Sequence, residues 1–229
     1  MKIVSINGSP NGMRGITGLV LGRLLEQARH AGAETQNYTL DDYTVHACRG
    51  CFSCSKEGTC PVTDDYARLK DAVIQADGII FASPNYMYHI SSQMKVFIDR
   101  SFSFLYHLRK LVGKHAVAVG ASGGPFADIV ESYLLDILGK MGCWNVGSIG
   151  VSHYQLEDAA EKEKALQEAG ELGERLVAAI RTQQTYRDQE SIQADNHEVM
   201  RALMILRKDA WPFEYNYWKK HWALEEEQE

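Results

Sequence analysis

Short runs of apolar, often β-branched residues alternate along this chain with longer segments of helical periodicity. This alternation constrains the fold more than any other feature of the sequence. The predicted strands are residues 2–7, 33–40, 78–83, 115–120 and 144–151. The predicted helices are residues 15–31, 63–75, 91–103, 126–141 and 157–182.

Strands of continuous apolar character are typical of parallel sheets that helices cover on both faces. The chain therefore predicts an α/β fold, a doubly wound five-stranded parallel sheet in a three-layer sandwich. We expect residues 1–182 to form this domain. In such a fold, ligands bind outside the carboxyl ends of the strands, at the point where the strand order reverses.

Residues 183–229 predict a C-terminal helical and aromatic extension. Helical spacing runs from 197 to 207, and six of the twelve residues from 211 to 222 are aromatic. Aromatic and methionine enrichment is typical of subunit interfaces, so we expect the extension to contact a second copy of the chain. The alternative is a tail that packs on its own domain. Residues 225–229 are expected to form a solvated end.

Charge and hydropathy argue against two classes of partner. The chain has 24 basic and 30 acidic residues and a net charge of −6, which disfavours a general nucleic-acid binder. No apolar run approaches the roughly 18 residues of a membrane span. The first residues turn polar too early for a signal peptide. We therefore expect a cytoplasmic protein without nucleic-acid or membrane partners.

The first predicted strand runs into a Gly- and Ser-rich loop that opens a helix, an arrangement that favours anion binding. The loop has neither GxxxxGK[ST] nor GxGxxG, which argues against an NTPase and against the usual dinucleotide site. It suits a single terminal phosphate, although a plain turn is the alternative. The residues expected to bind there are Ser9, Asn11, Arg14, Gly15, Ile16 and Thr17.

Two further loops, at 83–88 and 121–125, follow the third and fourth predicted strands and so lie on the same sheet edge. A planar ligand there would contact aromatic and methionine side chains and the backbone of the Gly-rich loop. The alternative is that these are ordinary half-buried loop residues. The candidate binding residues are Pro84, Asn85, Tyr86, Met87, Ser122, Gly123 and Gly124.

Four of the five cysteines lie within thirteen residues, at Cys48, Cys51, Cys54 and Cys60. So tight a cluster favours a metal or redox site over a disulfide framework. Four thiolates in one loop, 46–61, suit a [4Fe–4S] cluster, whereas structural zinc usually takes two separated pairs. Zinc and metal-free thiols are the alternatives. The fifth cysteine, Cys143, is expected to be a buried structural thiol.

These loops together resemble the NAD(P)H-dependent FMN reductases of the flavodoxin-like fold. The similarity lies in Gly8-Ser9-Pro10 with Gly15-Ile16-Thr17, and in Ser83-Pro84-Asn85-Tyr86 followed by the Lys95–Arg100 segment. Within a flavodoxin-like fold, this cysteine loop resembles the cysteine loop of the iron–sulfur flavoproteins. The chain departs from the family at Ile16, where Asn is common, and at Asn85, where an apolar residue is common.

The resemblance implies FMN on the three loops, a [4Fe–4S] cluster on the four cysteines and NAD(P)H as a co-substrate. It also implies a homodimer or homotetramer, and a ferredoxin-like protein or a small acceptor such as a quinone as electron partner. Because FMN would supply the chemistry, no catalytic side chain is expected. The helix expected to start near Thr63 would direct its positive end at the reduced cluster.

Two other functions fit the same residues. One is an NAD(P)H-dependent FMN or quinone reductase that has no cluster. The other is a non-enzymatic electron carrier or redox sensor.

Overall fold

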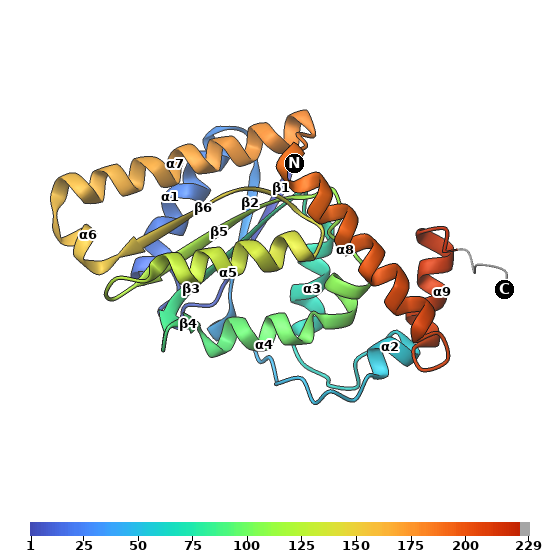
Figure 1. The fold of residues 1–229 in the computed structure, drawn as a ribbon. Coiled ribbons are helices and arrows are strands. Elements are labelled where there is room, and N and C mark those ends of the chain that lie inside the picture. The colour runs from blue at the N-terminus through green and yellow to red at the C-terminus, as the bar shows by residue number, and fades with distance from the viewer. Residues whose placement is uncertain (225–229) are drawn as a thin grey trace.

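A computed structural model describes residues 1–224, in which helices cover both faces of a central sheet (Figure 1). The strands are β1 (Lys2–Asn7), β2 (Glu34–Thr39), β3 (Gly78–Tyr86), β4 (His89–Ile90), β5 (His115–Ser122) and β6 (Trp144–Ser152). The helices are α1 (Ile16–His30), α2 (Ser53–Glu57), α3 (Tyr66–Gln75), α4 (Ser92–Arg100), α5 (Ala127–Lys140), α6 (His153–Glu157), α7 (Ala159–Thr182), α8 (Arg187–Leu206) and α9 (Pro212–His221). Two short 3-10 turns, η1 (Gly12–Arg14) and η2 (Leu40–Asp42), and a π-helical segment, η3 (Phe102–His107), complete the order.

The predicted doubly wound, flavodoxin-like sheet is confirmed. Its strand order is β2-β1-β3-β5-β6, and all of these neighbours are parallel. The short β4 was not predicted and pairs antiparallel with the end of β3. The order in which successive strands are added to the sheet reverses between β1 and β3. The carboxyl ends of these strands therefore form the crevice where such folds bind ligands.

Alternate residues of each central strand point to opposite faces of the sheet, and both faces are buried. Ile79 and Phe81 of β3 pack in the core beneath α3, α4 and α5, whereas Ile80 and Ala82 pack beneath α1 and α7. All four are fully buried. This explains why the strands lack polar alternation in the sequence.

Three helical segments differ from the sequence prediction. Helix α8 starts ten residues before the predicted 197, because its first half is polar and carries no apolar periodicity. The predicted helix 91–103 ends as α4 at Arg100 and continues as the π-helical η3. The cysteine loop contains a short helix, α2, that propensity alone did not indicate.

The C-terminal extension packs against the cysteine loop of its own chain. Helix α9 lies beside α2 (Figure 1). Trp218 is 1% exposed, and its indole Nε1 donates a hydrogen bond to the His107 carbonyl oxygen (2.9 Å). The tail thus covers its own domain. The domain boundary at 182 and a contact with a second copy stay predictions, and the predicted solvated end, residues 225–229, lies outside the described residues.

One buried carboxylate joins the extension to two other elements. Glu214 of α9 is fully buried, and its Oε2 lies 2.8 Å from His107 Nδ1. Its Oε1 accepts a hydrogen bond from Ser55 Oγ of α2 (2.9 Å). Because a buried carboxylate needs such partners, Glu214 fixes α9 against both α2 and η3.

No helix within residues 1–224 has the length and apolar character needed to cross a membrane.

Replacing Glu214 by Ala should lower the free energy of unfolding by about 3–5 kcal/mol, because it leaves His107 and Ser55 buried without a partner. Urea unfolding measures the loss. The control is Glu198→Ala on the exposed face of α8, which should change stability by less than about 0.5 kcal/mol. Equal stability of both variants would contradict the role given to Glu214.

Candidate functional site

The loop between β1 and α1 carries the predicted anion-binding residues. Gly15 precedes the 15-residue helix α1, and no side chain caps the helix there. The first-turn N–H groups of a helix have no intrahelical partners. Because no side chain caps them in α1, they favour a bound anion. Buried Asn7 accepts a hydrogen bond from the Ser9 backbone N–H (2.9 Å) and fixes the start of the loop. Of the predicted residues, Ser9 and Thr17 are buried, Gly15 and Ile16 are half-buried, and Asn11 and Arg14 are exposed.

Close packing at Gly8 ties this loop to the start of α4. A Cβ at Gly8 would lie 2.7 Å from Met94 Cβ, so any side chain would push the loop away from the helix. Ser91, the N-cap of α4, donates to the Gly8 carbonyl oxygen (2.7 Å), and its N–H donates to Ser83 Oγ (2.9 Å). One serine thus joins the carboxyl ends of β1 and β3 to α4.

The second loop presents exposed aromatic and sulfur-containing side chains. Met87 is 93% exposed and Tyr86 is 45% exposed. The backbones of Met87 and Tyr88 are left-handed, with φ of 49° and 62°. Non-glycine residues hold this conformation where the surrounding loop requires it. The predicted stacking residues Tyr86 and Met87 are therefore available to a flat ligand at this edge.

The third loop approaches the second through a side chain and a ring contact. Asn85 Nδ2 donates to the Phe126 carbonyl oxygen (2.8 Å), and the rings of Tyr88 and Phe126 lie 5.3 Å apart. Asn85, which follows Pro84 at the end of β3, therefore holds the two loops together.

The Ser122 hydroxyl fixes the conformation of the third loop, and the space beside Gly123 in this loop is open. Ser122 Oγ donates to the Pro125 carbonyl oxygen (2.9 Å) and accepts from the Gly124 N–H (3.2 Å). A Cβ added at Gly123 would meet no atom within 4 Å. The three loops follow adjacent strands, and they offer a helix N-terminus, exposed rings and free backbone to a phosphate-bearing planar ligand.

Behind the third loop, Glu131 of α5 faces the ends of β5 and β6. A Cβ on Gly150 would lie 2.9 Å from Glu131 Oε2. That oxygen is buried and has no hydrogen-bond partner among the described residues. Burial, with a smaller contribution from the Asp128 carboxylate, raises the pKa of Glu131 to about 7.

The four clustered cysteines line one small cavity of about 50 Å³. Cys48 and Cys51 are exposed, and Cys54 and Cys60 are half-buried. Left-handed backbone at Gly50, Phe52 and Gly58 turns the loop around this cavity, with φ of 63°, 57° and 77°. Among the described residues, no three His, Cys, Asp or Glu side chains are close enough together to hold a metal ion. The loop therefore brings the thiols to one cavity without drawing them onto a common centre.

The thiols differ in their surroundings. Hydrogen bonding from the Ser53 backbone lowers the pKa of the exposed Cys51 thiol. Burial raises the pKa of Cys54. Cys143 is fully buried outside the loop, as predicted, and burial raises the pKa of its thiol to about 12.

Arg100, the last residue of α4, closes the cysteine loop. Its side chain is 2% exposed and pairs with Asp64, with 2.6 Å between Nη1 and Oδ2. Nη1 also donates to the His46 carbonyl oxygen (2.9 Å), and Nη2 donates to the Val62 carbonyl oxygen (3.5 Å) and to Cys60 Sγ (3.4 Å). One guanidinium therefore binds both stems of the loop and one of its thiols.

Helix α4 connects the two predicted sites. Ser91 at its start binds the loop between β1 and α1, and Arg100 at its end binds the cysteine loop. Nine residues at 1.5 Å rise per residue span about 13 Å. The sheet-edge loops and the cysteine cavity are thus fixed relative to each other by one short helix.

The helix expected near Thr63 starts at Tyr66, three residues later than predicted. Helix α3 begins at Tyr66, and the Tyr66 N–H donates to Asp64 Oδ1 (3.1 Å). Asp64 also pairs with Arg100. A carboxylate therefore accepts one N–H at this helix end. The guanidinium of Arg100 lies 3.4 Å from Cys60 Sγ, and the effect of the helix dipole on a cluster stays a prediction.

Sequence reasoning missed three contributors to this region. The Lys95–Arg100 segment was part of the family pattern, but the pattern did not indicate that Arg100 binds Cys60, 40 residues earlier, and so closes the cysteine loop. Glu131 and Glu214 carried no signal, because their buried positions depend on elements distant in the sequence.

The sequence matches a known protein family over more than half of its length. Residues 1–156 match the sequence model of a family described as NADPH-dependent FMN reductase. An iron–sulfur flavoprotein of Archaeoglobus fulgidus is 32% identical over 176 residues, covering 71% of this chain and 88% of that protein. An iron–sulfur flavoprotein of Methanocaldococcus jannaschii is 40% identical over 124 residues, covering 53% of this chain and 63% of that protein. The chain thus spans slightly less than two thirds of this second relative.

Solved structures share the fold at low sequence identity. An NAD(P)H:quinone oxidoreductase from Methanothermobacter marburgensis has a TM-score of 0.60 at 19% identity, covering 77% of this chain and 96% of that chain. RosB, solved with a bound 8-demethyl-8-formylriboflavin-5'-phosphate intermediate, has a TM-score of 0.63 at 14% identity, covering 86% of this chain and 87% of that chain. These similarities extend beyond the sheet and support the observed layer order.

Replacing Arg100 by Gln should open the cysteine loop, because it removes the charge that holds both stems. We expect the Cys54 and Cys60 thiols of the metal-free protein to react faster with Ellman's reagent, and the free energy of unfolding to fall by about 3–5 kcal/mol. Lys95→Gln on the same helix is the control, since Lys95 and Asp99 form an exposed pair of little energetic value. Identical thiol reaction rates in R100Q and K95Q would refute the role of Arg100.

Replacing Glu131 by Gln should stabilise the protein more at pH 8 than at pH 5. The pKa of Glu131 rises from an ordinary 4.5 to about 7 on folding. The contribution of neutral Glu131 to the free energy of unfolding is therefore complete below about pH 4.5. It is lost as the pH rises through 7 and the carboxyl group ionises. Gln stays neutral and avoids that loss. Urea unfolding of both proteins at the two pH values tests this, and a pH-independent difference would argue against it.

Proposed function

Because this chain belongs to the NADPH-dependent FMN reductase family, whose members are FMN-dependent oxidoreductases, we propose that it is an iron–sulfur flavoprotein. In this proposal it relays electrons between FMN and a [4Fe–4S] cluster. One observation carries the cluster part: Cys48, Cys51, Cys54 and Cys60 all line a single cavity. The name of the Archaeoglobus relative supports the same reading.

The three sheet-edge loops suit FMN. The uncapped start of α1 would hold the phosphate group, with Arg14 near enough in the loop to add charge. Tyr86 and Met87 would lie against the flavin rings, and the backbone of Gly123 and Gly124 would face their polar edge. The bound flavin would supply two-electron exchange with a nicotinamide donor, while these residues bind and orient it.

The cysteine cavity suits an iron–sulfur cluster in donor type and in charge. Four thiolates are the usual ligand set for such clusters. Phe52, Phe102 and Phe104 line the same cavity and would limit the access of water. Arg100 brings a buried cation to Cys60 and would offset part of the negative charge of the thiolates. These features support Cys48, Cys51, Cys54 and Cys60 as the ligands.

A cluster-free NAD(P)H-dependent FMN or quinone reductase is the second candidate. The observation in its favour is that the described thiols are not drawn close enough together to hold a metal ion. An FMN-dependent NADH:quinone oxidoreductase of Xanthomonas euvesicatoria is 25% identical over 197 residues and is covered along its full length. A quinone is therefore the small acceptor we favour, with a ferredoxin-like protein as the protein partner and a homodimer or homotetramer as the assembly.

The visible absorption spectrum of protein purified without oxygen separates the two candidates. We expect broad iron–sulfur absorption beneath flavin bands, with four iron and four sulfide per chain. Flavin bands without iron or sulfide would favour the cluster-free reductase. A colourless protein that cannot be loaded with FMN would overturn the flavin assignment.

Replacing Cys54 by Ser should remove the cluster and leave FMN bound, because the cysteine loop and the flavin loops lie at opposite ends of α4. The ratio of iron to FMN per chain measures this. Cys143→Ala is the matched control, since Cys143 is a buried thiol outside the loop, and it should retain both groups. Loss of FMN together with iron in C54S would argue against separate sites.

A further inference from the structure

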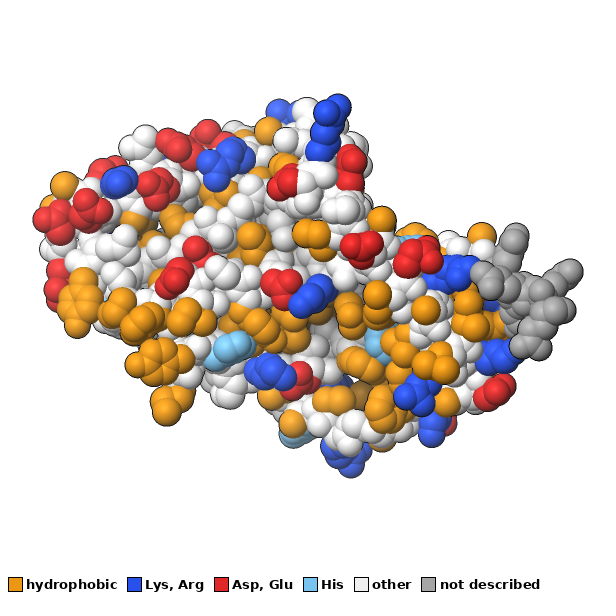
Figure 2. Space-filling view, in the orientation of Figure 1, with side chains coloured by type: hydrophobic (Ala, Val, Ile, Leu, Met, Phe, Trp, Pro, Cys, Tyr) orange, Lys and Arg blue, Asp and Glu red, His pale blue; other side chains and the backbone are white. Residues whose placement is uncertain are grey.

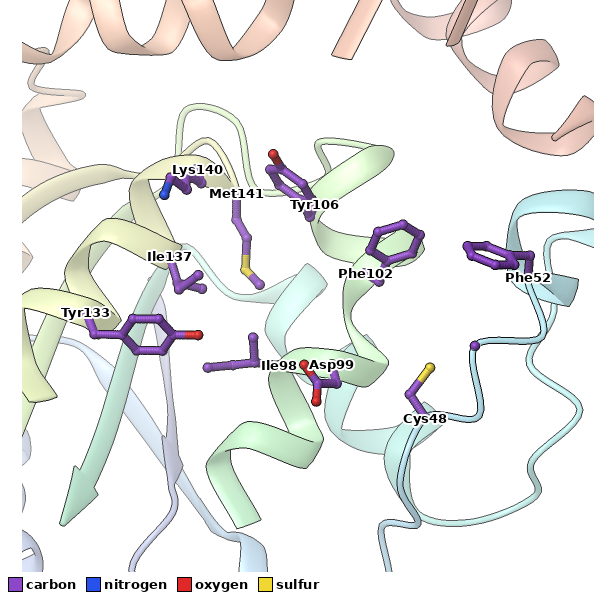
Figure 3. A pocket seen from close by; sticks show the side chains of 11 residues that line it. Cys48, Phe52, Ile98, Asp99, Phe102, Tyr106, Tyr133, Ile137, Lys140 and Met141 are labelled. Carbon is purple, nitrogen blue, oxygen red and sulfur yellow. The ribbon is translucent and has the colours of Figure 1, made fainter. Parts of the chain in front are cut away.

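A groove of about 580 Å³ runs between the cysteine loop, α4, η3 and α5 (Figure 3). It is distinct from the three sheet-edge loops and none of its lining residues belongs to them. The lining residues that matter most for a ligand are Phe52, Phe102, Tyr106, Tyr133, Ile137 and Lys140. The volume lies within the range of small-molecule sites, about 300–1,000 Å³.

The walls of the groove are apolar and largely aromatic. Phe102 and Tyr106 come from η3, Tyr133 and Ile137 from α5, and Phe52 from the cysteine loop. In Figure 3 the Tyr133 hydroxyl points into the space between these side chains. A flat aromatic molecule would gain ring contacts on several sides and a hydrogen-bond donor at one edge.

The charges at the rim are already partnered within their own helices. Lys140 pairs with Asp136 (2.7 Å), and Asp99 pairs with Lys95. The hydrogen bond from Lys140 to Asp136 raises the pKa of the ammonium group, which stays charged. The groove therefore has little net charge to offer a strongly charged ligand, and it favours a neutral molecule with polar oxygens.

The groove adjoins the cysteine cavity at one end and the second flavin loop at the other. Cys48, Phe52 and Phe102 line both the groove and the four-cysteine cavity. At the other end the Tyr133 ring lies 4.3 Å from the ring of His89, in the β3–β4 hairpin that carries Met87. A molecule in the groove would thus sit between the two proposed redox sites.

Apolar side chains also border this side of the molecule on the surface. Figure 2 shows them exposed over α5 and around α2 and α9. A groove with open access to such a surface admits a ligand from solution without unfolding of the loops.

From this geometry we propose that the groove binds a neutral planar aromatic electron acceptor of quinone type, beside the cysteine site and apart from the flavin loops. The proposal rests on the proposed function, because the electrons come from the redox groups assigned there. Overall, NAD(P)H and a proton from water reduce one quinone to its hydroquinone and leave NAD(P)⁺. Two electrons pass through the proposed redox groups, and the second proton comes with the hydride of the nicotinamide.

The test is a calorimetric titration of the FMN-loaded, oxidised protein with 2,3-dimethyl-1,4-naphthoquinone, a naphthoquinone whose blocked ring positions do not add to the exposed Cys48 and Cys51 thiols. Ile137→Trp fills the groove, and the matched control Ser132→Trp adds the same side chain to the exposed face of α5. We expect I137W to weaken binding at the groove by about tenfold or more, with FMN content unchanged, and S132W to bind like the wild type.

A second variant guards against misfolding of I137W. Tyr133→Phe removes only a hydroxyl, and it should weaken binding by about fivefold, the loss of one hydrogen bond. Unchanged affinity in both I137W and Y133F would overturn the proposal and leave the flavin edge as the quinone site. A change of molar mass in I137W by light scattering would also overturn it, because the groove would then lie between copies of the chain.

The groove site and the proposed function can fail independently of each other. A protein without iron or FMN that still binds naphthoquinone in an Ile137-dependent way would retain the groove site while the redox assignment fails. Wild-type protein that holds both groups but shows no Ile137-dependent binding would retain the proposed function and overturn the groove site.

Discussion

The ion pair between Arg100 and Asp64 determines the shape of the cysteine region. Both side chains are almost fully buried, and the guanidinium also binds backbone carbonyls on both stems of the loop. Buried charges persist only when they are paired and hydrogen-bonded. The pair therefore fixes where the loop leaves and rejoins the domain, and the four thiols between the stems line one cavity.

This constraint reaches the three sheet-edge loops through α4. The helix is anchored at its start by the hydrogen bonds of Ser91 to the loop between β1 and α1 and to β3, and at its end by Arg100. A rigid element with both ends fixed sets the spacing of the two sites without long loops. Side chains on its flank, such as Ile98, then form the floor of the groove beside both sites.

The sequence allowed the sheet to be predicted because its signal is local. Runs such as residues 78–83 are continuously apolar, and both faces of β3 proved to be buried. That the four cysteines line one cavity was predictable, because thirteen residues carry them all. The first half of α8 was not predictable, since its polar residues gain order from contacts such as that between Gln189 and Asn145. The buried pair of His107 and Glu214 joins positions 107 residues apart, and no local pattern indicates it.

The contact between α2 and α9 has a consequence for the order in which the protein is made. Ser55 and Glu214 are separated by 159 residues, and Phe52 of the cysteine cavity stacks on Trp211 at 5.7 Å between ring centroids. During synthesis the cysteine loop emerges long before the segment that covers it. Until that segment arrives, the thiols lie in a loop with an incomplete apolar wall. Loading of the proposed cluster onto the nascent chain would therefore meet an open site, which α9 would cover only after it has emerged.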